Sequence, residues 1–458
     1  MKGDFSTTTF DPEKDFFRVL TQYGSVQTDG DWNEQAANLL HYMQTLAVDL
    51  IGPYAGPVGA YGFAVTPNGE NDNFDVGKGR YYVGGLLCEN YVDDVTYLNQ
   101  PYLPDPEPLQ AKTYVVYLDV WERHLNHLEG ISAREKALNR AGIATRSNVV
   151  WQVKAQALDS PLAGKEAVMP ALKNRLALSD VGLRVRINPD LIGRAGYAKN
   201  RLYRVEIHYG GDRPTFKWSR ESDAVVFPAI DVEPDAAGRF ITVQLGHLGY
   251  DNTPGLMVDD WVEFVDEASI LKNNPDRLYQ IASVDVAGQK VRLKGNSAIV
   301  FERHNVRFLR RWDQQGANLE RGVDIKWNEW TALENGLEIR FESDNKPSIR
   351  SGDYWLIPVH NAYAELDWPK EIDRKGQVVI DNDTGQAMPA LVPPDGIVHH
   401  YAPLSIVNMT ATGINRLSDC RSSFSPKSSN YQYSYGRLGI GVDLIYPDIK
   451  AADIETAV

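Results

Sequence analysis

Cysteine is scarce in this chain, and its scarcity excludes two classes of protein. Among 458 residues only Cys88 and Cys420 are cysteines, and they lie far apart in the sequence. A disulfide-stapled secreted scaffold and a cysteine-rich metal site both need more cysteines at shorter spacings. We therefore expect synthesis in a reducing cytosol and no disulfide framework.

Long apolar runs and an excess of basic residues are also missing. No stretch approaches the roughly 18 apolar residues of a membrane-spanning helix, and no apolar core follows Lys2 as in a signal peptide. The formal net charge is −14. Binding to nucleic acid or to anionic lipid by charge alone requires Lys and Arg, so neither partner is expected.

Recognisable catalytic motifs are lacking as well. The chain has no Gly-x-Ser-x-Gly sequence and no cysteine in a nucleophile motif. A glycosidase carboxylate pair is defined by its separation in space and not by sequence, so that alternative stays open. We predict no enzymatic activity and no cofactor.

What the sequence does contain is a clear helix at residues 31–51. Asp31 is suited to cap it, with Glu34 three residues later, and Gly52-Pro53 ends it. Apolar residues at spacings of three and four form one stripe on this helix: Ala36, Leu39, Leu40, Met43, Leu46, Ala47 and Leu50. A shorter helix is expected within residues 10–20.

This N-terminal arm and helix must pack on something, and its aromatic side chains are the natural anchors. Aromatic side chains bury a large apolar surface, which suits interfaces. We therefore predict an interface that contains five aromatic residues: Phe5, Phe10, Phe16, Phe17 and Trp32.

The rest of the chain shows the period-two pattern of strands. Strong strands are predicted at 113–121 and 149–157, a hairpin or bulge at Gly84-Gly85, a polar helix at 132–139, and a barrel or sandwich within 201–311. The fold class is therefore mainly β, with sandwich or small-barrel units and an N-terminal helical arm, α+β overall. The predicted domains are 1–60 (arm and helix), 61–200 (β-rich with a helical insertion), 201–320 (all-β) and 321–458 (β-rich with an extended tail).

Two stretches resemble metal sites weakly. Glu122, His124, His127 and Glu129 would gather ligands on one face if that stretch were helical. Asp381 and Asp383 lie in an oxygen-rich stretch, but Val392 stands where a calcium loop of the EF-hand type needs glutamate. A polar loop and a hairpin turn are the better interpretations, so no metal is predicted and the weak candidates are Glu122, His124, Asp381 and Asp383.

The adjacent His399 and His400 give no better site. Neighbouring residues of an extended chain point to opposite faces, so these two side chains do not readily share one ion.

Several segments together resemble an uncharacterised bacterial family. It begins with Met1-Lys2-Gly3-Asp4-Phe5, Arg18-Val19-Leu20 and Asp31-Trp32-Asn33-Glu34-Gln35. Further matching segments follow in order at 119–124, 144–146, 150–153, 202–208, 216–221, 309–313, 352–358 and 399–404. Members of this family occur beside genes of contractile injection systems and phage-tail-like particles.

The resemblance implies a non-enzymatic structural or accessory component of such a particle, at its baseplate or spike. Its partners would be other particle subunits and further copies of itself, arranged in a ring or as a homo-oligomer. It would be made in the cytosol and then assembled into a particle, either membrane-anchored or released. The alternative is a carbohydrate-binding or carbohydrate-active protein whose tryptophans stack on sugar rings.

Overall fold

The structure is a computed structural model that describes most of the chain. The described residues are 10–125, 146–158, 165–175, 180–188, 201–222, 225–235, 237–249, 255–295, 306–343, 349–360, 365–381 and 385–425. Predictions for Phe5, His127, Glu129, Asp383 and the helix at 132–139 lie outside these residues.

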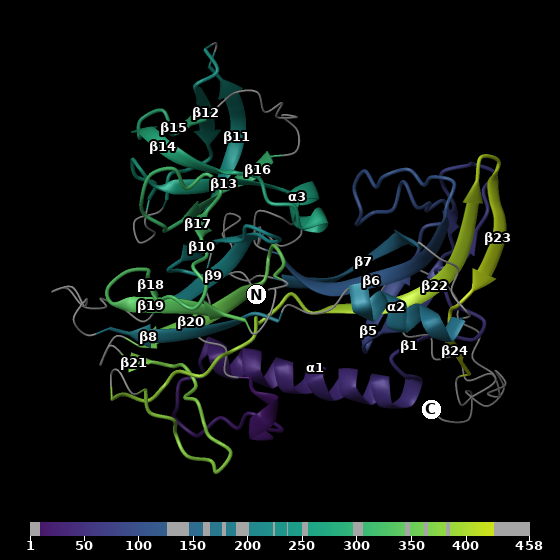
Figure 1. Ribbon diagram of the computed structural model, residues 1–458, viewed down its shortest axis with the longest axis horizontal. Coiled ribbons are helices and arrows are strands. Elements are labelled where there is room, and N and C mark those ends of the chain that lie inside the picture. Colours follow the sequence, from purple (N-terminus) through teal and green to yellow (C-terminus); the bar gives the residue numbers. More distant parts are fainter. Residues whose placement is uncertain are drawn as a thin grey trace, which may run out of the picture.

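Strands dominate the described chain, and they form three main β units (Figure 1). We call them the long sheet, the middle sheet and the barrel. The prediction of a mainly β chain with an N-terminal helix is confirmed. None of the helices in the described part of the chain is both long and apolar enough to cross a bilayer.

The long sheet has the strand order β23-β22-β6-β7. Both strands predicted from the apolar alternation are present, each longer than predicted because pairing with its neighbour continues past the apolar core. The strand bounds are β6 Thr113–Leu125, β7 Arg146–Ala157, β22 His399–Thr410 and β23 Gly413–Asp419.

A smaller sheet, β24-β1-β4-β5, lies beside the long sheet. Gly84 and Gly85 form the turn between β4 and β5, both with positive φ, so this is a hairpin. The bounds are β1 Tyr54–Pro57, β2 Val65–Thr66, β3 Asp75–Val76, β4 Gly79–Val83, β5 Leu86–Asn90 and β24 Ser423–Phe424, with β2 and β3 pairing separately.

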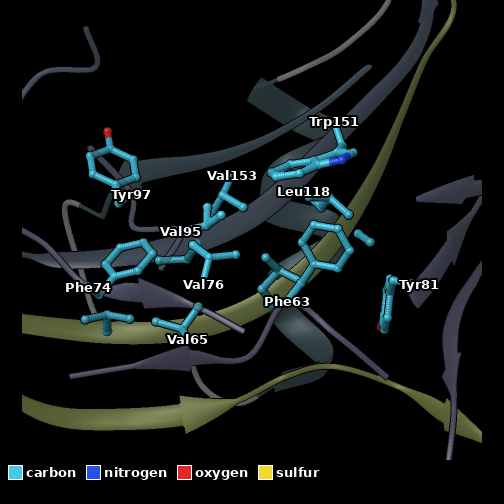
Figure 2. Packing of buried hydrophobic residues seen from close by; sticks show 14 of the residues in the cluster. Phe63, Val65, Phe74, Val76, Tyr81, Val95, Tyr97, Leu118, Trp151 and Val153 are labelled. Atoms are coloured by element: carbon cyan, nitrogen blue, oxygen red, sulfur yellow. The ribbon is translucent and has the colours of Figure 1, made fainter. Parts of the chain in front are cut away.

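The core between these sheets is aromatic and aliphatic (Figure 2). Leu118 points into it from β6, and Trp151 and Val153 do so from β7. The ring of Phe63 meets the indole of Trp151 edge-on, with 5.1 Å between centroids. Each buried aromatic of this kind removes about 150–250 Å² from water, which is the main stabilising term for this unit.

The middle sheet has the order β17-β10-β9-β20-β21 and packs on the three-stranded sheet β18-β19-β8. Tyr203, Val205 and Ile207 on β9 supply the core between them. The bounds are β8 Gly182–Ile187, β9 Arg201–Tyr209, β10 Thr215–Ser219, β17 Val323–Asp324, β18 Thr331–Ala332, β19 Leu337–Glu342, β20 Tyr354–His360 and β21 Glu365–Leu366.

The barrel is closed, with the strand order β11-β12-β15-β14-β13-β16. The predicted 201–320 domain therefore contributes to two β units, because β9 and β10 pair within the middle sheet and the strands of 226–312 close the barrel. Its bounds are β11 Val226–Pro234, β12 Phe240–Leu245, β13 Trp261–Asp266, β14 Leu278–Asp285, β15 Lys290–Lys294 and β16 Val306–Trp312.

The helices are few in the described chain. Helix α1 runs along one side of the molecule, from the middle sheet towards the long sheet (Figure 1). Their bounds are α1 Asp29–Ile51, α2 Val168–Arg175 and α3 Glu267–Lys272, with 3₁₀ turns η1 Pro12–Lys14 and η3 Lys165–Ala167.

Two details of the N-terminal region differ from prediction. Helix α1 begins earlier, because Thr28 is the N-cap and Asp31 is the third helical residue of a reciprocal capping box. The prediction that Asp31 caps the helix was wrong, because the Thr28 hydroxyl accepts from the N–H of Asp31 and the Asp31 carboxylate accepts from the N–H of Thr28. Within residues 10–20 only the 3₁₀ turn Pro12–Lys14 forms, because its apolar side chains find no core to pack on.

Candidate functional site: an outward helix and a charged junction

Helix α1 is oriented differently from an ordinary surface helix, because its apolar face points to the solvent. Its inward face is mostly small or polar, with Gly30 and Asn38 buried and Gln44 and Val48 partly buried. An ordinary surface helix turns its apolar stripe to the core. Here the stripe points away from the body of the protein.

We call the outward row of apolar residues the seam. Its large side chains are 43% to 71% exposed. The seam consists of Trp32, Ala36, Leu39, Met43, Leu46 and Leu50. Soluble monomers seldom expose a contiguous apolar patch of this size unless it is a binding site.

The arm before α1 adds further exposed apolar surface. Phe16 and Phe17 are exposed, whereas Phe10 is half-buried with its ring 5.6 Å from that of His41. The backbone N–H of Val19 donates to Oε1 of Gln35 at 3.0 Å, which ties the arm to the helix. Of the five predicted interface residues, three are thus exposed on one continuous N-terminal region: Phe16, Phe17 and Trp32.

A glycine turn holds α1 on the body. A Cβ on Gly85 would lie 2.6 Å from the carbonyl oxygen of Gln44, so the β4–β5 turn touches the helix backbone. A real Cβ does not fit at that distance, and the φ of +79° is itself unfavourable for any other residue.

Gly85→Ala should therefore loosen the seating of α1. We expect a loss of about 1–2 kcal/mol from the backbone conformation, together with hydrogen exchange in α1 accelerated roughly tenfold or more by the lost contact. Gly211→Ala is the matched control, because Gly211 has a φ of +83° and a Cβ added there would have no heavy atom within 4 Å. Equal exchange rates in α1 of both variants would contradict a seating role for Gly85.

The second candidate site is a cavity of about 500 Å³ where the long sheet, the middle sheet, the barrel and α1 meet. The lining is charged to an unusual degree for a place enclosed by four elements. Its charged side chains include Arg123, Arg204, Glu206, Lys217, Glu263 and Arg310.

An ion-pair network crosses this junction from the middle sheet to the barrel. Nζ of Lys217 on β10 lies 2.8 Å from both carboxylate oxygens of Glu263 on β13 and 3.4 Å from Oε1 of Glu206 on β9. Glu206 also accepts a hydrogen bond from Nε of Arg204 at 2.7 Å. These side chains are almost fully buried, so the charges are screened little by water.

Tryptophan completes the network on the barrel side. The indole N–H of Trp312 donates to Oε2 of Glu263 at 2.9 Å, and the ammonium of Lys217 lies 4.4 Å from the centroid of the indole rings. Burial opposes ionisation of Glu263, but Lys217 and Arg310 outweigh it and lower its pKa. The network thus joins two β units through paired charges.

His208 lies at the edge of this network and is fully buried. Neither of its ring nitrogens has a hydrogen-bond partner among the described residues. Burial, with a further contribution from Lys217, lowers the pKa of His208 to about 3. The ring is therefore neutral at physiological pH.

The weak metal candidates lie in two separate segments of the chain. Glu122 and His124 lie on β6, which stays a strand to Leu125, so the helical spacing that a metal site would need is not present there. Both line the cavity. At Asp381, the carbonyl oxygen accepts a hydrogen bond from the N–H of Gly385 at 2.8 Å. The described residues contain no group of three His, Cys, Asp or Glu suited to hold a metal ion.

His399 and His400 point to opposite faces of β22. Nδ1 of His399 lies 2.6 Å from Oδ1 of Asp119, and Nζ of Lys154 lies 2.7 Å from the other oxygen. Burial would raise the pKa of Asp119, but these two partners outweigh it and lower the pKa. His400 lines the cavity instead.

The charged junction was not predicted from the sequence, although a signal for it was present. Strand β9 alternates Arg204, Glu206 and His208 with apolar residues, which is typical of a strand with one face in water. In the structure both faces are buried. Four of the segments that carry the family resemblance contribute residues to the junction: 202–208, 216–221, 309–313 and 352–358.

An outward apolar seam and an inward charged junction are the two main features of this multi-unit β protein. The family model for a family of unknown function (DUF6519) matches residues 1–191 and 187–454, so the chain belongs to that family. A search of curated proteins gave no match.

Proposed function

We propose that this protein is a non-enzymatic structural subunit of a phage-tail-like particle, which joins a neighbouring subunit through α1 and the arm. The observation that carries the proposal is the outward seam from Trp32 to Leu50. Leaving it in water forgoes about 25 cal/mol for each Å² of apolar surface. An assembled particle would cover that surface.

The proposal of a phage-tail-like particle rests on the resemblance of the chain to proteins encoded beside contractile injection systems. The charged junction fits a structural role, because paired charges between β10 and β13 link the middle sheet to the barrel. A subunit that transmits force between neighbours needs such fixed relations between its parts.

The tryptophans do not favour the carbohydrate alternative. All ten lie among the described residues, and only Trp32 on the seam is mostly exposed, at 68%. Three are partly buried, Trp327, Trp330 and Trp368, and the other six are buried. A sugar-binding platform would need several exposed tryptophans along one groove.

The test is incorporation into particles. In cells that carry the particle genes, the wild-type chain should co-purify with particles at constant stoichiometry through a density gradient. The double variant Leu39→Lys/Met43→Lys should be reduced at least tenfold in the particle fraction, because two buried charges would oppose docking. The measurement is quantitative mass spectrometry of the purified particles.

The matched control is Val286→Lys, which places the same charge on an exposed side chain of the β14–β15 turn. It should be incorporated like the wild type. Particles that contain all other subunits but none of the wild-type chain would refute the proposed function.

A further inference from the structure

We infer that the seam of α1 binds the seam of a second copy of this chain, with the two helices antiparallel. The inference deepens the proposed function and rests on it, since it names the neighbour that covers the helix. The exposed seam could be met by many apolar surfaces. Three properties of the seam select a copy of itself.

The first property is its spacing. The intervals between successive seam residues, from Trp32 to Leu50, are four, three, four, three and four. This is the heptad pattern of a coiled-coil seam, in which each side chain fits between four residues of a facing helix. The natural partner of such a seam is another helix with the same spacing.

The second property is the match of side-chain sizes. In an antiparallel pair, Trp32 meets Leu50 of the other copy, Ala36 meets Leu46, and Leu39 meets Met43. Each small or large side chain then faces one of intermediate size, so the layers are more even in volume than in a parallel pair, which favours close packing. A parallel pair would set Trp32 against Trp32 and leave a gap between two Ala36 side chains.

The third property is the exposed area of the seam and the charge of the residues beside it. From their exposed fractions, the seam residues with flanking Leu40 and Tyr42 offer on the order of 800 Å² per helix, or ~1,600 Å² for a pair, within the range of stable interfaces. Asp49 is the only charged residue that flanks the seam directly, and an antiparallel pair sets it beside Gln35 and not beside another carboxylate.

A two-fold pair through α1 also leaves the rest of each copy free for other contacts. The seam lies on the side of α1 opposite to Gly30 and Asn38, which face the body. The two bodies would therefore stand on opposite sides of the helix pair. The contact is isologous, so it closes on itself and makes a dimer as the unit of assembly.

The first experiment is sedimentation equilibrium of the full chain across a concentration series. The wild type and Val286→Lys should sediment with the mass of two chains at micromolar concentration. Leu39→Lys/Met43→Lys should sediment as one chain, with the dimer dissociation constant raised at least ~100-fold. Circular dichroism should be the same for all three, since the changed side chains are exposed. A wild-type chain that is monomeric throughout would overturn the inference.

The second experiment tests the orientation by disulfide formation. Both native cysteines are buried, so a cysteine placed on the seam is the reactive one. A mixture of Leu39→Cys and Met43→Cys should form a cross-linked dimer of the two variants under mild oxidation, at least tenfold faster than either variant alone. Cross-linking of Leu39→Cys with itself at the rate of the mixture would indicate a parallel pair and overturn the antiparallel arrangement.

The two proposals fail in different ways. If the wild type is monomeric but enters particles only with an intact seam, the partner is another subunit and the structural role stands. If the wild type forms the predicted dimer but is absent from particles, the dimer stands and the structural role fails.

Discussion

Replacing Lys217 by methionine should lower the free energy of unfolding by about 3–5 kcal/mol, the range found when one partner of a buried ion pair is removed. The ammonium is only 2% exposed and is held by both oxygens of Glu263 and by Glu206. Without it, the buried carboxylates of Glu206 and Glu263 lose the cation that they share. The measurement is urea unfolding at neutral pH.

The control for the effect of burial is a solvent-exposed ion pair between a lysine and a carboxylate. Lys294 lies 3.3 Å from Asp259 with both side chains more than half exposed, so Lys294→Met should cost less than about 1 kcal/mol. The double variant Lys217→Met/Glu263→Met should be less destabilised than the sum of the single changes, because it removes a buried charge together with its partner. Equal costs for Lys217→Met and Lys294→Met would contradict a buried network.

The stability of the protein should fall as the pH is lowered from 6.5 towards 3, and His208 should account for much of the fall. In the unfolded chain an imidazole has a pKa near 6.5, whereas in the folded protein the pKa of His208 is about 3. Between these values the unfolded state binds a proton that the folded state rejects, so protons favour unfolding. From pH 7.5 to pH 5 the expected loss from this residue is about 2 kcal/mol.

His208→Phe is the variant that isolates this contribution. Phenylalanine keeps an aromatic ring in the buried position and cannot take a proton. Urea unfolding at pH 7.5 and pH 5 should show a loss about 2 kcal/mol smaller for His208→Phe than for the wild type. An identical loss in both proteins would show that His208 is not kept neutral by burial.

Much of the local structure was predictable because it depends on neighbouring residues alone. The strand at Thr113–Leu125 follows from a run of branched and aromatic side chains, and the hairpin at Gly84-Gly85 follows from two residues that tolerate positive φ. Helix α1 follows from the spacing of its leucines. Its starting residue was misjudged because Thr28 and Asp31 are both good capping residues, and which of them caps depends on the path of the preceding chain.

The candidate sites were predictable only in part. Trp32, Phe16 and Phe17 were chosen for their chemistry, and the structure places all three in the exposed N-terminal region. The charged junction was not found, because alternating charge on β9 has the same appearance whether that face meets water or another sheet. The barrel partner of Lys217 is Glu263, which lies 46 residues further along the chain.

The sequence by itself determined that this is a mainly β protein with a long N-terminal helix, and which residues share each face of its elements. Those properties arise from periods of 2 and 3.6 residues, which are local. Only the tertiary structure decided which face of each element packs on the protein and which face meets solvent. It turned the apolar side of α1 outward because the helix seats on Gly85 through a small, polar face, and it buried the charged side of β9 because the barrel packs there. Such choices depend on contacts between distant segments, and no local pattern encodes them.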